Sequence, residues 1–459
     1  MTHQIQKKQL PLRAGRWLIV GLLLLLLAAC GAGDQQASDT PTADAVAATE
    51  APTTAPPAPP TETPTPEAEA AAPTDIPPTD TPIEEDINED IDTADLVTAL
   101  EATIPIRPEG GTDGFDGINV FAADGIDGQA LWVAHSYGIR VFMPDEIPHF
   151  VAIYESADGA WNEIARIELE CADYVDEAGV NQVTIAPESL WFTVDGGAGA
   201  HSGCFDLLRW DGATFVDLIQ GFNSSPGAGD VTDLDGDGQN EVVLNATDPY
   251  IFCYACGVRL YAAQVLRWDG AQLTPVTLTE LGEDAAADVR EANNRAVALA
   301  NADLYNQALP LIEETATLAP EDAVVHWNAQ LIRLYAENRL AYVDGGYPIL
   351  SYVFYGDYAA AVDLMRDLTP VEIFSAESPL IMGTPAEGWI PEMSQYLVSF
   401  ADRAIAADPE LAHAYFLRAW GRYLADAGDP AIETDLAQAA TLTPEDALLQ
   451  AADEEITVP

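Results

Sequence analysis

The stretch Leu207-Leu-Arg-Trp-Asp-Gly-Ala-Thr-Phe-Val216 places two runs of aliphatic and aromatic residues on either side of an Asp-Gly pair. Such a pair between two runs of this kind is a strong local signal for a β-hairpin. The stretch returns as Val265-Leu-Arg-Trp-Asp-Gly-Ala-Gln-Leu273, and more loosely as Val151-Ala-Ile-Tyr-Glu-Ser-Ala-Asp-Gly-Ala-Trp161. We therefore expect three related hairpins, which is the mark of an internal repeat.

A further strand is predicted upstream of each hairpin. These strands are Ala130-Leu-Trp-Val133, Ser189-Leu-Trp-Phe192 and Glu241-Val-Val-Leu244. Residues 96–282 are thus predicted to form a β-repeat domain of three units, built as an irregular propeller-like domain or as a sandwich. Three units are too few for an ordinary propeller, which has four or more blades.

The third unit contains the acidic run Asp233-Leu-Asp-Gly-Asp-Gly-Gln-Asn-Glu241. Carboxylates at alternate positions can surround one hard cation, and glycine permits the sharp turn that this requires. An EF-hand is excluded because the twelfth position is Leu244 and a strand follows. The run resembles the calcium loops of FG-GAP and VCBS-type repeats. That resemblance implies a structural calcium ion with the ligands Asp233, Asp235, Asp237, Gln239 and Glu241; the alternative is an Asp/Gly turn that binds no ion.

Besides Cys30, the chain contains Cys171, Cys204, Cys253 and Cys256. An even number of cysteines in an exported protein predicts disulfides. Four cysteines allow three pairings, for example Cys171 with Cys204 and Cys253 with Cys256. The alternative is a zinc site made of His201, Cys204, Cys253 and Cys256, but export favours the disulfides.

The N-terminus has basic residues, then an apolar run that ends in Leu27-Ala-Ala-Cys30. This pattern indicates a secretory signal, since the run is short for a membrane span. It resembles a bacterial lipoprotein signal, which implies removal of residues 1–29 and lipidation of Cys30. The alternative is an uncleaved transmembrane helix. The lipoprotein prediction places the chain outside the cytoplasmic membrane and anchors it in the lipid bilayer.

Residues 30–95 consist mostly of Ala, Thr, Pro, Asp and Glu. Such a composition buries too little apolar area to offset its loss of conformational entropy, so we expect a lipidated, disordered tether. The whole chain has 18 basic and 75 acidic residues, a formal net charge of −57. This charge excludes nucleic acid as a partner, because phosphates would be repelled.

Residues 283–452 are rich in alanine and show helical periodicity. Leu318-Ala-Pro320, Leu368-Thr-Pro370, Ala407-Asp-Pro409 and Leu442-Thr-Pro444 are predicted helix ends. The pattern resembles tetratricopeptide repeats, which implies an α-helical solenoid that binds a protein or peptide. The apolar insertion 347–355 is predicted either to pack on these helices or to form a partner patch, and residues 453–459 are a tail.

No catalytic motif is found, and the sequence therefore predicts a protein that is not an enzyme. The predicted function is a lipid-anchored extracytoplasmic scaffold that binds an unidentified protein through its helical repeats. One alternative is a surface receptor for a glycan or other small ligand, which uses the β domain. In that case Trp161, Trp210 and Trp268 should be exposed at the hairpin tips, whereas burial favours the scaffold. A hydrolase without a recognisable motif is the third reading.

Overall fold

The fold was obtained as a computed structural model, and it describes residues 92–107, 114–139 and 147–458. The chain divides into the compact units Met1–Pro82 and Ile83–Pro459, and all described residues belong to the second unit. The predicted signal peptide, the lipidation site Cys30 and nearly all of the tether lie outside the described residues. Within the described part, no helix is both long enough and apolar enough to cross a membrane.

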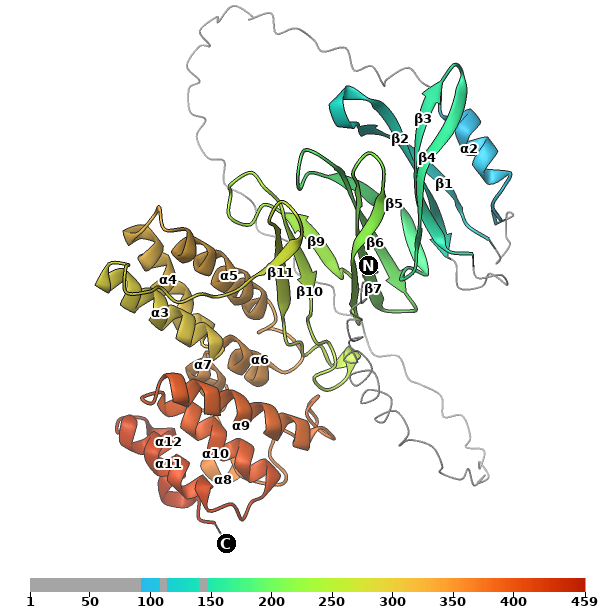
Figure 1. The fold of residues 1–459 in the computed structure, drawn as a ribbon. Coiled ribbons are helices and arrows are strands. Elements are labelled where there is room, and N and C mark those ends of the chain that lie inside the picture. Colours follow the sequence, from blue (N-terminus) through green and yellow to red (C-terminus); the bar gives the residue numbers. More distant parts are fainter. Residues whose placement is uncertain (1–91, 108–113, 140–146, 459) are drawn as a thin grey trace, which may run out of the picture. The chain divides into compact units, whose positions relative to one another are not determined.

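The strands form three antiparallel meanders, and each meander has four strands in sequence order. Their bounds are β1 (Gly117–Asp124), β2 (Ala130–Ile139), β3 (His149–Ala157) and β4 (Ala160–Leu169) in the first meander; β5 (Tyr174–Val183), β6 (Leu190–Ala198), β7 (Ser202–Trp210) and β8 (Phe215–Asn223) in the second; and β9 (Gly229–Thr232), β10 (Glu241–Asn245), β11 (Ala263–Trp268) and β12 (Leu273–Val276) in the third. Because β2 also pairs with β5, the first two meanders share one curled sheet of eight strands, a half-barrel (Figure 1). The third meander is a separate sheet.

The three predicted hairpins are confirmed as β3–β4, β7–β8 and β11–β12, and the predicted upstream strands as β2, β6 and β10. Each unit has one strand more than predicted, namely β1, β5 or β9. The meanders are not arranged as separate propeller blades, because two of them share a sheet. The prediction of a β-rich domain followed by helices is confirmed. The β-rich domain consists of the half-barrel and a separate four-stranded sheet.

Alternate side chains of the half-barrel enter different cores. Leu131, Val133 and Phe192 belong to the inner core, while Trp132 and Trp191 point to the outer face. At the first meander the outer face is covered by helix α2 (Ala94–Glu101), and at the second by the third meander.

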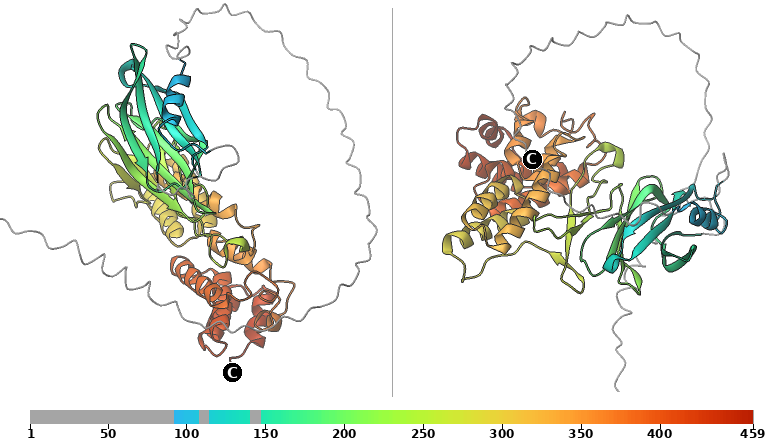
Figure 2. Two further views of the ribbon diagram at one scale, coloured as in Figure 1. Left: turned by 90° about the vertical axis from the view of Figure 1, so that its right-hand side faces the viewer. Right: turned by 90° about the horizontal axis from the view of Figure 1, so that it is seen from above.

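The helical region follows the third meander and is drawn in yellow to red in Figures 1 and 2. Its helices are α3 (Ala287–Asn301), α4 (Tyr305–Leu318), α5 (Ala323–Leu340), α6 (Pro348–Tyr355), α7 (Tyr358–Asp363), α8 (Pro370–Ile373), α9 (Ile390–Ala407), α10 (Ala412–Ala425), α11 (Ala431–Leu442) and α12 (Ala447–Glu455). Several consecutive helices pack on each other, and one hydrophobic core extends through the region. The tetratricopeptide identity stays a prediction.

Three of the four predicted helix ends are confirmed, since α4, α9 and α11 end at Leu318, Ala407 and Leu442. The fourth prediction, at Leu368-Thr-Pro370, is wrong: α7 has already ended at Asp363, and Pro370 begins α8. Proline is well tolerated in the first turn of a helix, where its missing N–H is not needed. Thr369 and Glu372 form a capping box there, which explains why a helix starts at this position.

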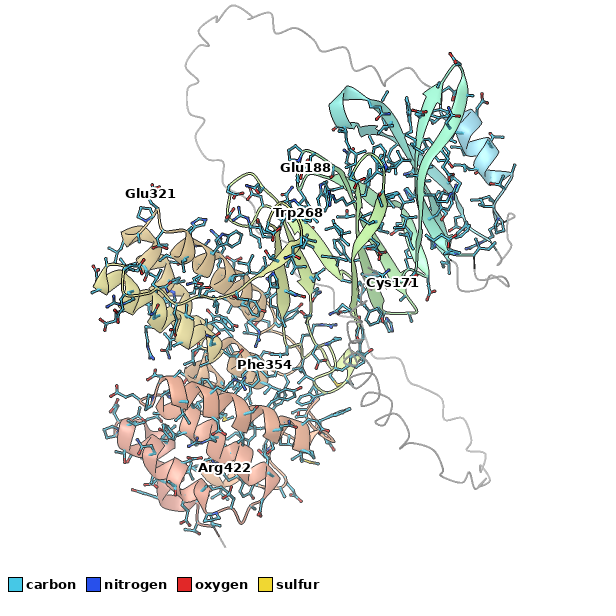
Figure 3. All side chains as sticks on the ribbon, in the orientation of Figure 1. Cys171, Glu188, Trp268, Glu321, Phe354 and Arg422 are labelled. Atoms are coloured by element: carbon cyan, nitrogen blue, oxygen red, sulfur yellow. A yellow bond between two sulfur atoms is a disulfide. The ribbon has the colours of Figure 1, made fainter. Side chains whose placement is uncertain are left out.

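The apolar insertion is the helix α6 rather than a loop. Its residues Ile349, Leu350, Val353 and Phe354 are buried in the helical core (Phe354 is labelled in Figure 3). The interpretation that this segment packs on the other helices is therefore confirmed, and it is not an exposed partner patch.

Candidate metal centre

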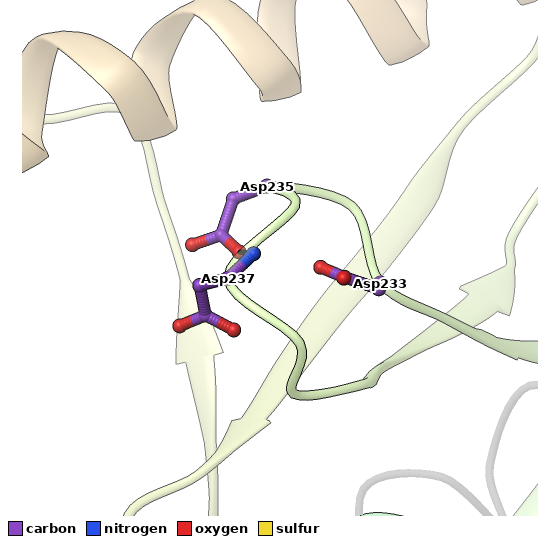
Figure 4. Close-up of side chains that lie close together, drawn as sticks. All are labelled: Asp233, Asp235 and Asp237. Atoms are coloured by element: carbon purple, nitrogen blue, oxygen red, sulfur yellow. Dashed lines mark hydrogen bonds between the residues drawn. The ribbon is translucent and has the colours of Figure 1, made fainter. Parts of the chain in front are cut away.

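The acidic loop connects β9 to β10 in the third meander. Asp233, Asp235 and Asp237 each direct one carboxylate oxygen to a common region, where these oxygens lie within 4.8 Å of one another (Figure 4). Carboxylate oxygens are the ligands that calcium and magnesium prefer. The structure thus brings together three of the five predicted ligands.

Hydrogen bonds within the loop hold this arrangement. The two carboxylate oxygens of Asp233 accept the N–H groups of Gly236 and Gly238, at 2.7 and 3.0 Å. Both glycines have positive φ, 76° and 87°, a conformation that costs other residues energy. The alternation of Asp and Gly therefore has a local cause, because each carboxylate turns the backbone that follows it.

Glu241 begins β10 and is fully buried. Its Oε2 accepts the N–H of Leu234 at 3.1 Å, whereas its Oε1 has no hydrogen-bond partner. Burial raises the pKa of Glu241 to about 7, with a smaller contribution from the charge of Asp235. Gln239 lines an open cavity of about 560 Å³ beside the loop.

Arg267 on β11 extends into the acidic loop, which sequence reasoning missed. Its guanidinium group donates a hydrogen bond to Asp237, and it lies 3.6 Å from Glu241 Oε1 and 4.0 Å from Asp235 Oδ2. The one signal in the sequence is its place in the repeated Leu-Arg-Trp-Asp-Gly motif. The donor set fits a divalent cation, but such a cation would have to share these carboxylates with Arg267.

The acidic loop also contacts helix α5. His326 Nε2 lies 2.9 Å from the carbonyl oxygen of Asp235, and the Arg267 guanidinium lies 5.2 Å from the ring centre of Trp327. Further along α5, the hydroxyl of Tyr335 bonds both the N–H and the carbonyl of Ala263 on β11, at 3.2 and 2.6 Å. The loop therefore lies at the joint between the third meander and the helices.

The four cysteines form two disulfides, Cys171–Cys204 and Cys253–Cys256. The first connects the β4–β5 connection to β7 (Cys171 is labelled in Figure 3), and the second closes a short turn. The alternative zinc set is not assembled, because its three cysteine sulfurs are all in disulfides. His201 instead stacks on Tyr254, with ring centres 4.8 Å apart.

The tryptophan side chains of the three hairpins pack against other side chains and do not project into solvent. Trp210 is 2 % exposed and belongs to the inner core of the half-barrel. Trp161 packs edge-on against Trp132, and Trp268 against Trp191, with ring centres 5.1 and 5.0 Å apart. Their packing agrees with a structural role.

A buried polar group on β2 and β3 was also missed by sequence reasoning. Ser136 Oγ lies 3.1 Å from His149 Nδ1, and His135 is buried next to them. Burial lowers the pKa of His135 to about 4, so this ring is neutral at physiological pH. A serine and a histidine at this distance can form a nucleophile pair, but both are fully buried here. No motif in the sequence marks them.

The acidic loop is thus the group of described side chains whose geometry most directly suggests a ligand. Compared with known proteins, the chain matches no family model, no curated protein and no solved structure.

Proposed function

We propose that this chain is a non-enzymatic, lipid-anchored extracytoplasmic scaffold that holds a protein or peptide on its helical region. In this proposal the acidic loop binds a structural calcium ion and stabilises the contact between the helices and the third meander. The observation that carries the proposal is the position of the loop: its carboxylates converge, and its backbone contacts α5 at His326. A cation bound here would stabilise the joint between the two regions.

A calcium ion would be held by Asp233, Asp235 and Asp237, with Glu241 as the buried acid behind them. It would supply positive charge to a group of four carboxylates that, among the described residues, only one arginine contacts, Arg267 on β11. Calcium sites of extracellular modules are commonly weak, with dissociation constants of about 0.1–1 mM. This range suits a structural ion outside the cell.

The calcium proposal is tested by thermal unfolding of the full chain in detergent, with calcium and with a chelator. Calcium at about 100 times its dissociation constant should stabilise the native state by about 2.7 kcal/mol. Asp235→Asn should lose most of this gain, whereas the exposed control Glu280→Gln should keep it. An unchanged melting temperature in the chelator would contradict the calcium ion.

The binding role of the helices follows from how repeat helices pack. Helix pairs bury one face on their neighbours and leave the rest for a partner. Large apolar side chains are exposed at Leu318, at the end of α4, and at Val371 in α8, which are 60 % and 58 % exposed. In this proposal these two exposed apolar side chains contact the partner.

Chemical crosslinking in the bacterial envelope tests this role. Photo-reactive residues at positions 318 and 371 should crosslink a partner protein, whereas the same residue at position 164, an exposed site on β4, should not. Crosslinks only from position 164 would assign partner binding to the half-barrel instead.

The lipid anchor is tested separately, by labelling cells with a radioactive fatty acid. The wild-type chain should incorporate the label and Cys30→Ser should not. Equal labelling of the two chains would exclude lipidation at Cys30. The glycan-receptor alternative has less support, because Trp161, Trp210 and Trp268 are packed against other residues and do not form a row of exposed rings.

A further inference from the structure

Asp206 on β7 is a fully buried acid inside the half-barrel, away from the acidic loop. It is 0 % exposed, and neither oxygen of its ionised carboxylate accepts a hydrogen bond from a donor group. The residue opposite it on β6 is Val194, a member of the inner core, so Asp206 faces the same core. A buried carboxylate without a partner is so unfavourable that the group takes up a proton instead.

A second acid, Asp217 on β8, faces the same core. The pairing of β7 with β8 shifts after Leu207, and Leu218 is left without a partner. This bulge places Asp217 opposite Leu208, which belongs to the inner core. The Oδ1 atom of Asp217 is also buried without a hydrogen-bond partner. Two acids from neighbouring strands, one fully buried and one half-buried, thus lie on the same side of the sheet.

The surroundings of Asp206 supply no compensating cation. The acids that act on it are Asp217 on β8 and Glu170, just after β4; its neighbours across the ladders are Val194 and Gln220. No basic side chain of the described part forms an ion pair with it. The Cys171–Cys204 disulfide links the residue after Glu170 to β7, which limits how far the acids can separate.

We propose that Asp206 and Asp217 hold one proton in common, and that this proton makes the half-barrel more stable in acid than above neutrality. Two carboxyl groups that cannot both ionise share a proton in this way. Asp206 is the donor: its O–H hydrogen-bonds the carboxylate of Asp217. The pair is a proton-binding element inside a fold whose other described acids lie mostly at the surface.

The direction of the pH effect follows from the electrostatics. Burial, with the neighbouring acids, raises the pKa of Asp206 from 3.8 to about 7. Burial also raises the pKa of Asp217, against hydrogen bonds from Gln220 and the N–H of Ile219. A group whose pKa is raised on folding contributes its full stabilisation of the native state when the pH is below its pKa in the unfolded chain. This contribution is lost as the pH rises through the folded-state pKa, which is about 7 here.

The test is urea unfolding of the full chain in detergent at several pH values between 5 and 8. In the wild type, this pair should make the equilibrium constant for unfolding rise up to tenfold per pH unit from pH 5 to about 7, and the rise should level off above that pH. Asp206→Asn can still donate a hydrogen bond to Asp217; it should remove this slope and be more stable than the wild type at pH 8. Glu168→Gln, an exposed acid on β4, is the matched control and should keep the wild-type slope.

Two outcomes would overturn the proposal. One is an Asp206→Asn variant with the same pH slope as the wild type. The other outcome concerns the Asp235→Asn variant at pH 8. If millimolar calcium raises its free energy of unfolding, and adding Asp206→Asn abolishes this gain, the pair binds a cation. If Asp206→Asn does not fold, infrared spectra of Glu241→Gln decide, because Glu241 is the other buried acid whose pKa is raised to about 7. In that variant a protonated carboxyl band that disappears near pH 7 supports the proton, and a band lost entirely below pH 5 refutes it.

Discussion

The hexapeptide Leu-Arg-Trp-Asp-Gly-Ala occurs twice in this chain, at 208–213 in the second meander and at 266–271 in the third. Both copies end one strand of a hairpin and make the same turn. Asp211 Oδ1 accepts the N–H groups of the residues two and three positions later, at 3.0 and 2.7 Å, and Asp269 Oδ1 does the same at 2.9 and 2.9 Å. The following glycines have φ values of 90° and 96°. Identical residues therefore make identical turns.

The side chains before the turn differ completely between the copies. Trp210 lies in the inner core, whereas Trp268 packs in the contact between the third meander and the second. Arg209 Nε donates to Ser189 Oγ at 3.0 Å, whereas Arg267 lies in the acidic loop. Short-range hydrogen bonds therefore determine the turn, while the neighbouring sheet determines what each side chain contacts.

The largest expected difference between the copies concerns tryptophan. Trp210→Ala should cost about 3–5 kcal/mol of unfolding free energy, because it leaves a cavity in a closed core. Trp268→Ala should cost roughly half of that, because Trp268 is only partly buried and borders an open cavity. Urea unfolding of the two variants measures both values. Equal losses would mean that the two tryptophans have equivalent surroundings.

The glycines should behave alike. Gly212→Ala and Gly270→Ala place a Cβ in open space, so the cost arises from the left-handed backbone alone. We expect a loss of about 1–2 kcal/mol in each variant, again by urea unfolding. A difference above about 1 kcal/mol between the two would show that the turns depend on their surroundings.

The arginines should differ in calcium binding. Arg267→Gln removes the cation that shares the acidic loop, so the dissociation constant for calcium should fall about tenfold, a change of about 1.4 kcal/mol. Arg209→Gln, the matched control, should leave it unchanged. Isothermal titration of the full chain measures both constants. Weaker calcium binding in Arg267→Gln would indicate that Arg267 supports the ion rather than competing with it.

The smallest effect is expected from the turn acids. The backbone N–H groups lower the pKa of Asp211 and of Asp269. The stabilisation that these aspartates contribute is present when the pH is above their pKa in the unfolded chain, and it is lost as the pH falls through their lowered pKa in the folded chain. Asp211→Asn and Asp269→Asn should each slightly reduce the fall in melting temperature between pH 5 and pH 2. The two variants should match each other; a clear mismatch would break the equivalence of the turns.

Features that depend on residues close together in the chain were predictable. The Asp-Gly pairs predicted the hairpins, and three of the four proline positions predicted helix ends. The alternation from Asp233 to Asp237 predicted carboxylates that converge. The strand that precedes each predicted unit was missed. β5 and β9 follow turns without an Asp-Gly pair, and β9 has only four residues. β1 follows Asp113-Gly114 and Asp116-Gly117, but no strand pattern was recognised after them.

Arg267 in the acidic loop was not predictable, because its partners are 26 to 32 residues earlier in the chain and the same motif puts Arg209 elsewhere. The pairing of Asp206 with Asp217 depends on a bulge that inserts Leu218 and turns Asp217 inward. A strand pattern read with a strict period of two would give Asp217 and Ile219 the same face.

The amino-acid chain alone specifies the turns, the ends of α4, α9 and α11, and the local shape of the acidic loop, since hydrogen bonds between residues fewer than six positions apart form whatever surrounds them. The folded protein is needed to specify which of the three cysteine pairings occurs, that the Arg267 guanidinium lies among the acids of the loop, and which carboxyl keeps a proton. These outcomes depend on burial and on charges brought together from distant strands and helices. Burial is a property of the packed sheet, and no short stretch of chain contains it.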